Sequence, residues 1–163
     1  MTEKIQPDES EIGNTSDAKV EAEQKTAKLI WFVDDNSEII GSIMRMARIT
    51  PHLADIGADF KHFKEGEEAI NEFVNIIENG GQLPTIILMD YRLNEEVNNP
   101  KYELGADVIA EIKRIADAHE IAVPEIIAFS SQDDYAQELL SAGATASIKK
   151  SDYSSVKHFF ETL

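Results

Sequence analysis

Cysteine is absent from the 163-residue chain, which excludes disulfide scaffolds, thiolate zinc sites and cysteine nucleophiles. A domain of this length buries enough apolar surface to fold without such a staple. Basic residues are scarce: 15 Lys and Arg stand against 31 Asp and Glu, and the net charge is −16 at pH 7. Phosphate backbones and anionic lipid repel such a chain, so we expect no binding to nucleic acid or to a membrane surface.

Long hydrophobic stretches are missing as well. The first apolar run, Leu29–Val33, has five residues and is far too short to span a membrane. The opening residues MTEKIQPDES lack the basic start and apolar stretch of a secretion signal. We therefore expect a soluble, cytoplasmic protein. Residues 1–27 are acidic and polar and predict a disordered arm, whereas residues 28–163 predict one folded domain.

From residue 28 onward, short apolar runs alternate with amphipathic stretches. The runs favour strands buried on both faces, and they are Leu29–Val33, Ile86–Met89, Ile126–Phe129 and the weaker Ala144–Ile148, with Ala58–Phe63 as a more alternating candidate. Apolar residues at helical spacing lie between them, in stretches near 39–47, 69–77, 108–116, 133–142 and 151–163. Five strand–helix units predict an α/β fold: a doubly wound, five-stranded parallel sheet with helices on both faces.

Polar residues follow these strands where ligand chemistry collects in such a fold. Asp34-Asp35 follow the first strand and Asp90 the third, while Ser130-Ser131 and Lys149-Lys150 end the fourth and fifth. Three clustered carboxylates need a cation between them, and such a hard oxygen site suits Mg²⁺. One carboxylate oxygen can then attack a phosphoryl donor, while a lysine and a serine hydroxyl stabilise the transferred oxygens.

The motifs VDDN at 33–36, ILMDYRL at 87–93, IIAFSS at 126–131 and GATASIKKSD at 143–152 resemble the receiver domain of two-component response regulators. FKEGEEAI at 63–70 is similar to the stretch that links the second strand to the second helix in this family. Each motif alone is common, but all of them occur here in order and on the expected strand ends. The resemblance covers roughly residues 28–163 and implies that the predicted α/β fold, with its doubly wound five-stranded parallel sheet, is of the flavodoxin or CheY-like kind.

The resemblance implies a role for each matching residue. Asp90 matches the phosphoacceptor, Ser130 the switch serine or threonine, and Lys150 the family lysine. The implied metal ligands are Asp34, Asp35, Asp90 and the backbone carbonyl of Arg92, with Mg²⁺ as the cofactor. Arg92 and Gln132 stand at the two variable positions that tune the lifetime of the phosphoryl group in this family.

The sequence also departs from the family pattern. Gly105, which matches the glycine that opens the third helix, stands fifteen residues after Asp90, so the loop 94–103 is extended. Ser151 replaces the proline that follows the lysine, and a trans peptide is expected there. Ser147 stands where many receivers carry an aromatic switch residue, and the proline a few residues past the acceptor is absent. These changes affect how a phosphorylated state would be read out more than whether it forms.

The resulting hypothesis is a single-domain response regulator, because no output domain follows the fifth helix. It would accept phosphate from a histidine kinase or phosphotransfer protein and signal to an unknown target through about residues 132–163, as a monomer or weak dimer. It would be a phosphoacceptor switch that catalyses only the phosphoryl transfer to itself and its own slow dephosphorylation, and not an enzyme with turnover. Two alternatives stay open: an unphosphorylated receiver-like scaffold, and a hydrolase of the haloacid-dehalogenase type, which needs an aspartate where Arg92 stands. The Asp34-Asp35 pair could alternatively cap a helix.

Overall fold

A computed structural model of the chain describes residues 27–93 and 100–163. The expected arm 1–27, except for Ala27, and residues 94–99 of the extended loop lie outside the described residues. In chain order the elements are β1 (Leu29–Val33), α1 (Ser37–Arg48), α2 (Pro51–Asp55), β2 (Asp59–Phe63), α3 (Gly66–Asn79), β3 (Ile86–Met89), the 3₁₀ helix η1 (Pro100–Tyr102), α4 (Gly105–Ala118), β4 (Glu125–Ser130), α5 (Asp133–Ala142), β5 (Ala146–Lys149) and α6 (Tyr153–Thr162).

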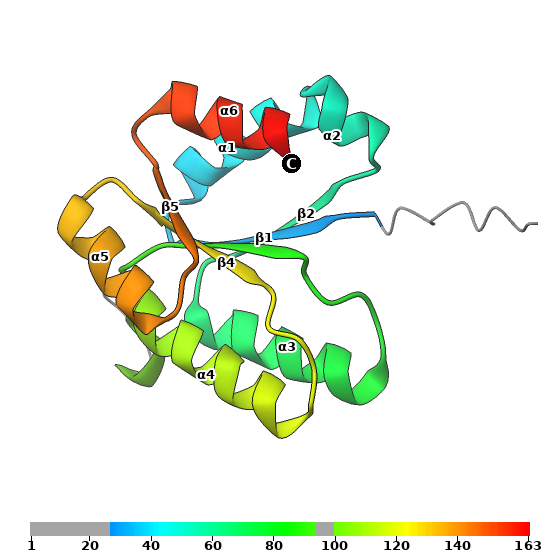
Figure 1. Cartoon of the computed structure of the whole chain (residues 1–163), viewed down its shortest axis with the longest axis vertical. Helices are drawn as coiled ribbons and strands as arrows, with labels where there is room; N and C mark the ends of the chain where they lie inside the picture. Colours follow the sequence, from blue (N-terminus) through cyan, green and yellow to red (C-terminus); the bar gives the residue numbers. More distant parts are fainter. Residues whose placement is uncertain (1–26, 94–99) are drawn as a thin grey trace, which may run out of the picture.

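The strands form one parallel sheet in the order β2-β1-β3-β4-β5. Helices α1, α2 and α6 cover one face, and α3, α4 and α5 cover the other (Figure 1). The predicted doubly wound α/β fold is therefore confirmed. Strand order reverses between β1 and β3, and in this architecture the carboxyl ends of two such strands border the crevice in which ligands bind.

The unbroken apolar run of β1 contributes side chains to the hydrophobic clusters on both faces of the sheet. Trp31 and Val33 pack into the cluster beneath α3 and α4, while Ile30 and Phe32 pack against α1 and α6 on the opposite face. All four side chains are fully buried, because alternate residues of a strand point to opposite faces and each face here carries helices. The strand thus holds both layers together and ends directly at Asp34.

The expected elements are present, and their ends differ by a few residues. Strand β5 spans Ala146–Lys149 and so begins two residues later than the predicted run Ala144–Ile148. The last helix begins at Tyr153 instead of at residue 151. Helix α2 was not predicted: its single buried apolar residue, Leu53, is too little to show a helical period. The local sequence could have indicated where α2 begins, because Thr50 at the N-cap followed by Pro51 is typical of a helix start.

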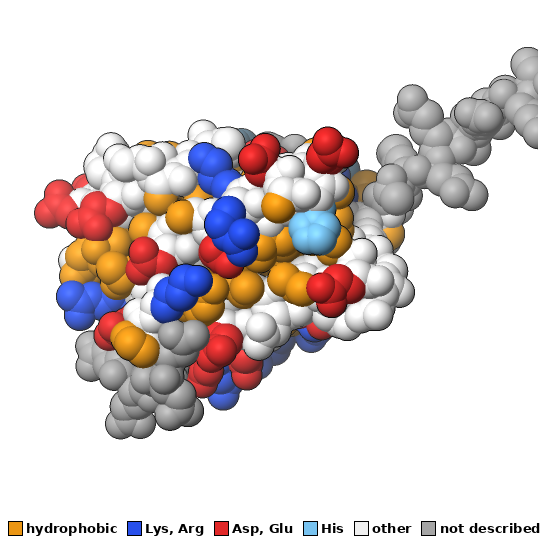
Figure 2. Space-filling model, turned by 90° about the horizontal axis from the view of Figure 1, so that it is seen from below, with side chains coloured by type: hydrophobic (Ala, Val, Ile, Leu, Met, Phe, Trp, Pro, Cys, Tyr) orange, Lys and Arg blue, Asp and Glu red, His pale blue; other side chains and the backbone are white. Residues whose placement is uncertain are grey.

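The surface over α3 and α4 carries charges of both signs. Figure 2 shows Lys and Arg side chains lying beside acidic ones on this face, with apolar atoms exposed between them. Within residues 27–93 and 100–163, no helix has the length and hydropathy that a membrane span requires.

The segment after β3 is fixed by the chain that returns from the extended loop. Arg92 and Leu104 form an antiparallel bridge, in which the Leu93 N–H donates to the Glu103 carbonyl at 2.8 Å and the Gly105 N–H donates to the Tyr91 carbonyl at 2.7 Å. Gly105 then begins α4, as the sequence predicts. A Cβ atom there would lie 1.9 Å from the backbone carbonyl oxygen of Asp90, so only glycine allows this approach.

We predict that Gly105→Ala lowers the free energy of unfolding by about 1–3 kcal/mol, because the added methyl group must push the Asp90 backbone aside. Gly41→Ala is a matched control within helix α1, where a Cβ would find its nearest neighbour at 3.9 Å. That change should be neutral or stabilise by about 0.5–1 kcal/mol. Urea denaturation followed by circular dichroism measures both, and an unaltered stability of the Gly105 variant would contradict the close approach.

Candidate functional site

Three carboxylates meet at the carboxyl end of the sheet. Asp34 follows β1 and Asp90 follows β3, and these strands are neighbours with Val33 paired to Met89. The Asp90 N–H donates to the Val33 carbonyl at 2.9 Å, which extends the ladder to the site. Carboxylate oxygens of Asp34, Asp35 and Asp90 lie within 4.8 Å of one another. Asp34 is fully buried, and Asp35 is exposed.

The Lys150 ammonium lies between two of these carboxylates. Its Nζ is 2.6 Å from Asp34 Oδ2 and 3.1 Å from Asp90 Oδ1, and only 9% of its side chain is exposed. The backbone N–H of Lys150 donates to the Ser130 carbonyl at 3.1 Å, and this hydrogen bond fixes the Lys150 backbone beside β4. The neighbouring Lys149 instead extends outward and lies 3.9 Å from Asp133. The structure therefore brings Lys150, and not Lys149, to the carboxylates.

The charge of this cluster is unbalanced, and the pKa values show it. Burial and the nearby charge of Asp34 raise the pKa of Asp90 to about 6, although Lys150 opposes the shift. Burial also raises the pKa of Asp34 above its ordinary value despite the ion pair with Lys150. Burial alone would lower the pKa of Lys150, but the two carboxylates outweigh it and raise that pKa. One ammonium thus fails to neutralise the acids around it.

The first turn of α1 tests the helix-cap reading of the acidic pair. Asn36 is the N-cap, and its side-chain oxygen accepts the Ile39 N–H at 3.0 Å. Asp34 accepts the Asn36 N–H at 2.9 Å and so holds the loop that precedes the helix. The reading of Asp34-Asp35 as the cap is therefore wrong, since Asn36 has that position.

A hollow of about 200 Å³ opens beside Asp90. The other predicted site residues gather around it, since its lining includes Arg92, Ser130, Gln132 and Lys150. The Ser130 hydroxyl donates to the Gln132 carbonyl at 3.3 Å and accepts the Gln132 N–H at 3.2 Å. Ser130 is thus buried at the site with its hydroxyl engaged by its own turn.

Three neighbours of the site were not predicted. The His62 ring lies 2.7 Å from the Asp34 carbonyl oxygen, and Tyr91 and Tyr135 line the hollow beside Asp90. The position of Tyr91 directly after Asp90 was a usable signal. His62 and Tyr135 gave none, because only the pairing of β2 with β1 and the packing of α5 bring them close.

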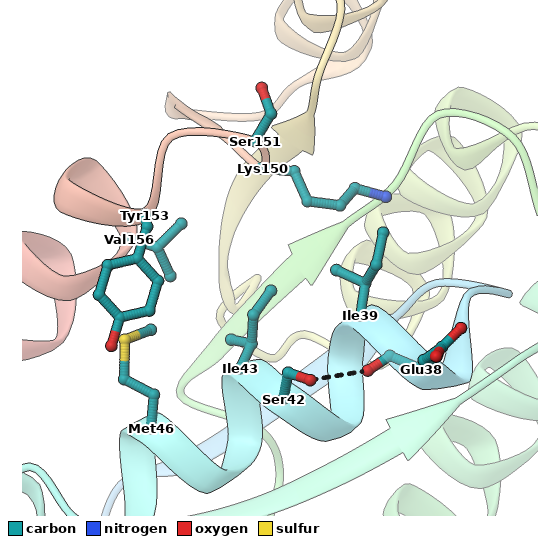
Figure 3. Close-up of a pocket in the computed structure, with 9 residues that line it drawn as sticks. All are labelled: Glu38, Ile39, Ser42, Ile43, Met46, Lys150, Ser151, Tyr153 and Val156. Carbon is teal, nitrogen blue, oxygen red and sulfur yellow. Dashed lines mark hydrogen bonds between the residues drawn. The ribbon is translucent and has the colours of Figure 1, made fainter.

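A second, larger hollow also borders Lys150. It measures about 360 Å³ and is lined by α1 residues including Ile39, Ile43 and Met46, and by Tyr153 and Val156 of α6. Figure 3 shows Ile39 and Ile43 pointing from α1 toward this space, with Lys150 above Ile39. Apolar surface therefore borders the buried cluster, and Ile39 is 40% exposed.

The donor set fits a hard divalent cation. Carboxylate oxygens are the ligands that Mg²⁺ and similar ions prefer, and Asp34, Asp35 and Asp90 offer them at mutually compatible distances. Burial is the main cause of the raised pKa of Asp90, and the charge of Asp34 adds to it; an added cation would offset that negative charge.

We predict that, without divalent metal, the Asp34 and Asp90 carboxyl groups destabilise the folded chain increasingly as pH rises from about 4 through 6. The raised pKa values of Asp34 and Asp90 mean that the folded state binds more protons than the unfolded state in this window, so ionisation costs folding free energy. Asp90→Asn should therefore raise the free energy of unfolding at pH 7.5 by on the order of 1 kcal/mol. Urea titrations in chelator measure this.

The exposed Asp117 of α4 supplies the control, and Asp117→Asn should change little. Added Mg²⁺ should stabilise the parent and leave the Asp90→Asn variant nearly unaffected. A variant less stable than its parent at pH 7.5 would contradict the proposed charge imbalance.

No protein-family model matches the chain, and no curated protein is significantly similar to it in sequence. Solved structures are similar. The phosphorylated cyanobacterial phytochrome response regulator RcpA matches with a TM-score of 0.61 and 21% identity, over 83% of this chain and 89% of that one.

Two further matches have similar extent. The Mn²⁺-bound form of the response regulator Rcp1 has a TM-score of 0.54 at 17% identity, over 83% of this chain and 90% of that one. A CheY-like receiver domain protein from Methanospirillum hungatei JF-1 has a TM-score of 0.55 at 17% identity, over 84% and 96%. The chain therefore has the fold of response-regulator receiver domains.

Proposed function

We propose that this chain is a response-regulator receiver domain that accepts a phosphoryl group on Asp90 in a Mg²⁺-dependent reaction. The observation that carries the proposal is the cluster of Asp34, Asp35 and Asp90 around the buried Lys150 ammonium. It lies at the carboxyl ends of β1 and β3, where strand order reverses. Fold alone does not give function, so the weight rests on these residues.

The reaction follows from the positions of these groups. An Asp90 carboxylate oxygen attacks phosphorus and forms an O–P bond, while the bond from phosphorus to the donor breaks. The donor is a phosphohistidine of a kinase or phosphotransfer protein, or a small acyl phosphate. With the pKa of Asp90 near 6, the carboxyl is largely ionised at neutral pH and more basic than an ordinary aspartate. Water later hydrolyses the aspartyl phosphate slowly.

Other residues have supporting roles in this proposal. Lys150, 3.1 Å from Asp90 Oδ1, can pair with a transferred phosphoryl oxygen. Ser130 can donate to another once its hydroxyl turns away from the Gln132 carbonyl. Asp34, Asp35, Asp90 and the Arg92 carbonyl would hold Mg²⁺, which neutralises charge on the phosphoryl oxygens when bound. Arg92 and Gln132, at the hollow, would tune hydrolysis.

Signalling would proceed through a changed protein-binding surface on about residues 132–163, which carry α5, β5 and α6. The partners would be a histidine kinase or phosphotransfer protein and a downstream protein target, with no nucleic acid and no membrane involved, and the chain would act in the cytoplasm as a monomer or weak dimer. The apolar hollow beside Lys150 supports docking of a protein donor close to the cluster. Arg92 in the place of a second aspartate argues against a phosphatase of the haloacid-dehalogenase type.

We predict that acetyl phosphate with Mg²⁺ adds the mass of one phosphoryl group to the intact protein. Chelation of the metal should abolish the adduct, and Asp90→Asn should not form it, because the nucleophilic oxygen is lost. Asp117→Asn, an exposed aspartate far from the cluster in sequence, is the matched control and should be modified like the parent. Intact-mass spectrometry gives the readout.

Modification of Asp90→Asn to the extent of the parent would contradict the assignment of the acceptor. If the parent forms no adduct and isothermal titration shows no Mg²⁺ binding, the proposal fails, and an unphosphorylated interaction scaffold becomes the better description. Continuous release of product from a generic phosphomonoester would instead favour a hydrolase.

A further inference from the structure

The residue directly after Asp90 connects the site to a helix. Tyr91 is only 8% exposed, and its ring stacks on that of Tyr135 in α5, with centroids 4.2 Å apart and planes 12° apart. Its hydroxyl donates to a carboxylate oxygen of Glu138, one helical turn after Tyr135. This hydrogen bond raises the pKa of the Tyr91 phenol above its ordinary value. Two contacts thus join one side chain to one face of α5.

The next residue reaches the same helix. The Arg92 guanidinium carbon lies 5.6 Å from the centre of the Tyr135 ring, in cation–π geometry. Tyr135 therefore contacts both residues that follow Asp90, one by stacking and one by charge. Tyr91, Arg92 and Tyr135 all line the hollow beside Asp90. The aromatic pair is consequently a wall of the space in which a phosphoryl group would lie.

Two other residues could link the site to α5 and the neighbouring strand β5. Ser147 of β5 is exposed and carries no ring that could rotate into the interior. Ser130 contacts the start of α5 through the Gln132 backbone. The backbone of Tyr91 is in turn fixed by the bond from the Gly105 N–H to its carbonyl. The Tyr91 side chain is therefore held at its backbone by α4 and contacts α5 through its ring and its hydroxyl.

We propose that Tyr91, Tyr135 and Glu138 are positioning residues that transmit phosphorylation of Asp90 to helix α5. This inference rests on the proposed function. A phosphoryl group on Asp90 adds negative charge within the hollow, where it attracts the Arg92 guanidinium from the Tyr135 ring and shifts the stack. Helix α5 responds because its face is held by that stack and by the Glu138 hydrogen bond. The device couples a local charge event to a two-state element.

The test uses the full chain with acetyl phosphate and Mg²⁺, and follows amide hydrogen exchange in peptides that cover 133–142. Phosphorylation of the parent should change the exchange rates of α5 severalfold, within the range usual for coupled sites. Tyr135→Leu removes the stack, and Glu138→Gln weakens the hydrogen bond without a change of shape. Glu138→Gln, at a residue that does not line the hollow, should form the adduct as the parent does. The α5 response per phosphorylated molecule should be mostly lost in both variants.

Three controls separate this role from a merely structural one. Tyr135→Phe keeps the ring and should restore the response. Tyr153→Leu removes a tyrosine of α6 that is 65% exposed and should behave as the parent. Glu78→Gln neutralises an exposed glutamate of α3 and matches the change at Glu138. Circular dichroism checks that each variant is folded, and Glu138→Gln still decides the question if Tyr135→Leu does not fold.

The outcomes are distinct. A normal adduct with an undiminished α5 response in both test variants overturns the inference and leaves the proposed function standing. An adduct in the parent without any α5 response also overturns it. Absence of an adduct in the parent contradicts the proposed function itself, and the inference fails with it.

Discussion

The site depends on one buried ammonium that serves two carboxylates. Lys150 lies between Asp34 and Asp90 with only 9% of its side chain exposed. A buried ion pair gains little over an apolar core, but removal of one partner leaves an uncompensated charge at high cost. Here burial, with the charge of Asp34 added to it, raises the pKa of Asp90 to about 6 even though Lys150 opposes the shift. The fold holds the negative charges of Asp34, Asp35 and Asp90 close together, and a bound cation or proton would reduce the repulsion between them.

The topology explains why such a cluster forms where it does. Asp34 and Asp90 are far apart in sequence but become neighbours because β1 pairs with β3. Lys150 arrives from the end of β5, next to β4, and its long side chain spans the remaining distance. Gly105 presses α4 against the Asp90 carbonyl. The backbone of Asp90 and Tyr91 is thus fixed by β1 on one side and by the start of α4 on the other.

Sequence predicted the strands and the strand-end residues well, because both follow from patterns a few residues long. The run Leu29–Val33 and the polar pair after it are visible without any tertiary knowledge. Helix α2 could not be predicted, because a single buried leucine does not produce a helical repeat of apolar residues. The contacts of Tyr91 escaped for another reason: its stack with Tyr135 depends on how α5 packs, which no local pattern encodes. The reading of Asp34-Asp35 as a helix cap failed because Asn36 is equally suited and stands one residue closer to α1.

The similarity to receiver domains is a similarity of fold, at 17–21% identity in the three matches described. What lies beyond the fold is the set of residues at the strand ends, and their departures from the family pattern have a physical consequence. With serine at position 147 exposed on β5, a buried ring cannot swing there. Aromatic side chains instead lie one residue after Asp90 and on the first turns of α5. A stacked pair with a guanidinium over one of its rings is sensitive to nearby charge, because the quadrupole of the Tyr135 ring attracts the Arg92 cation. In the proposed mechanism, a change of charge at Asp90 would therefore act on Arg92 and on the Tyr91–Tyr135 stack, and through them on α5.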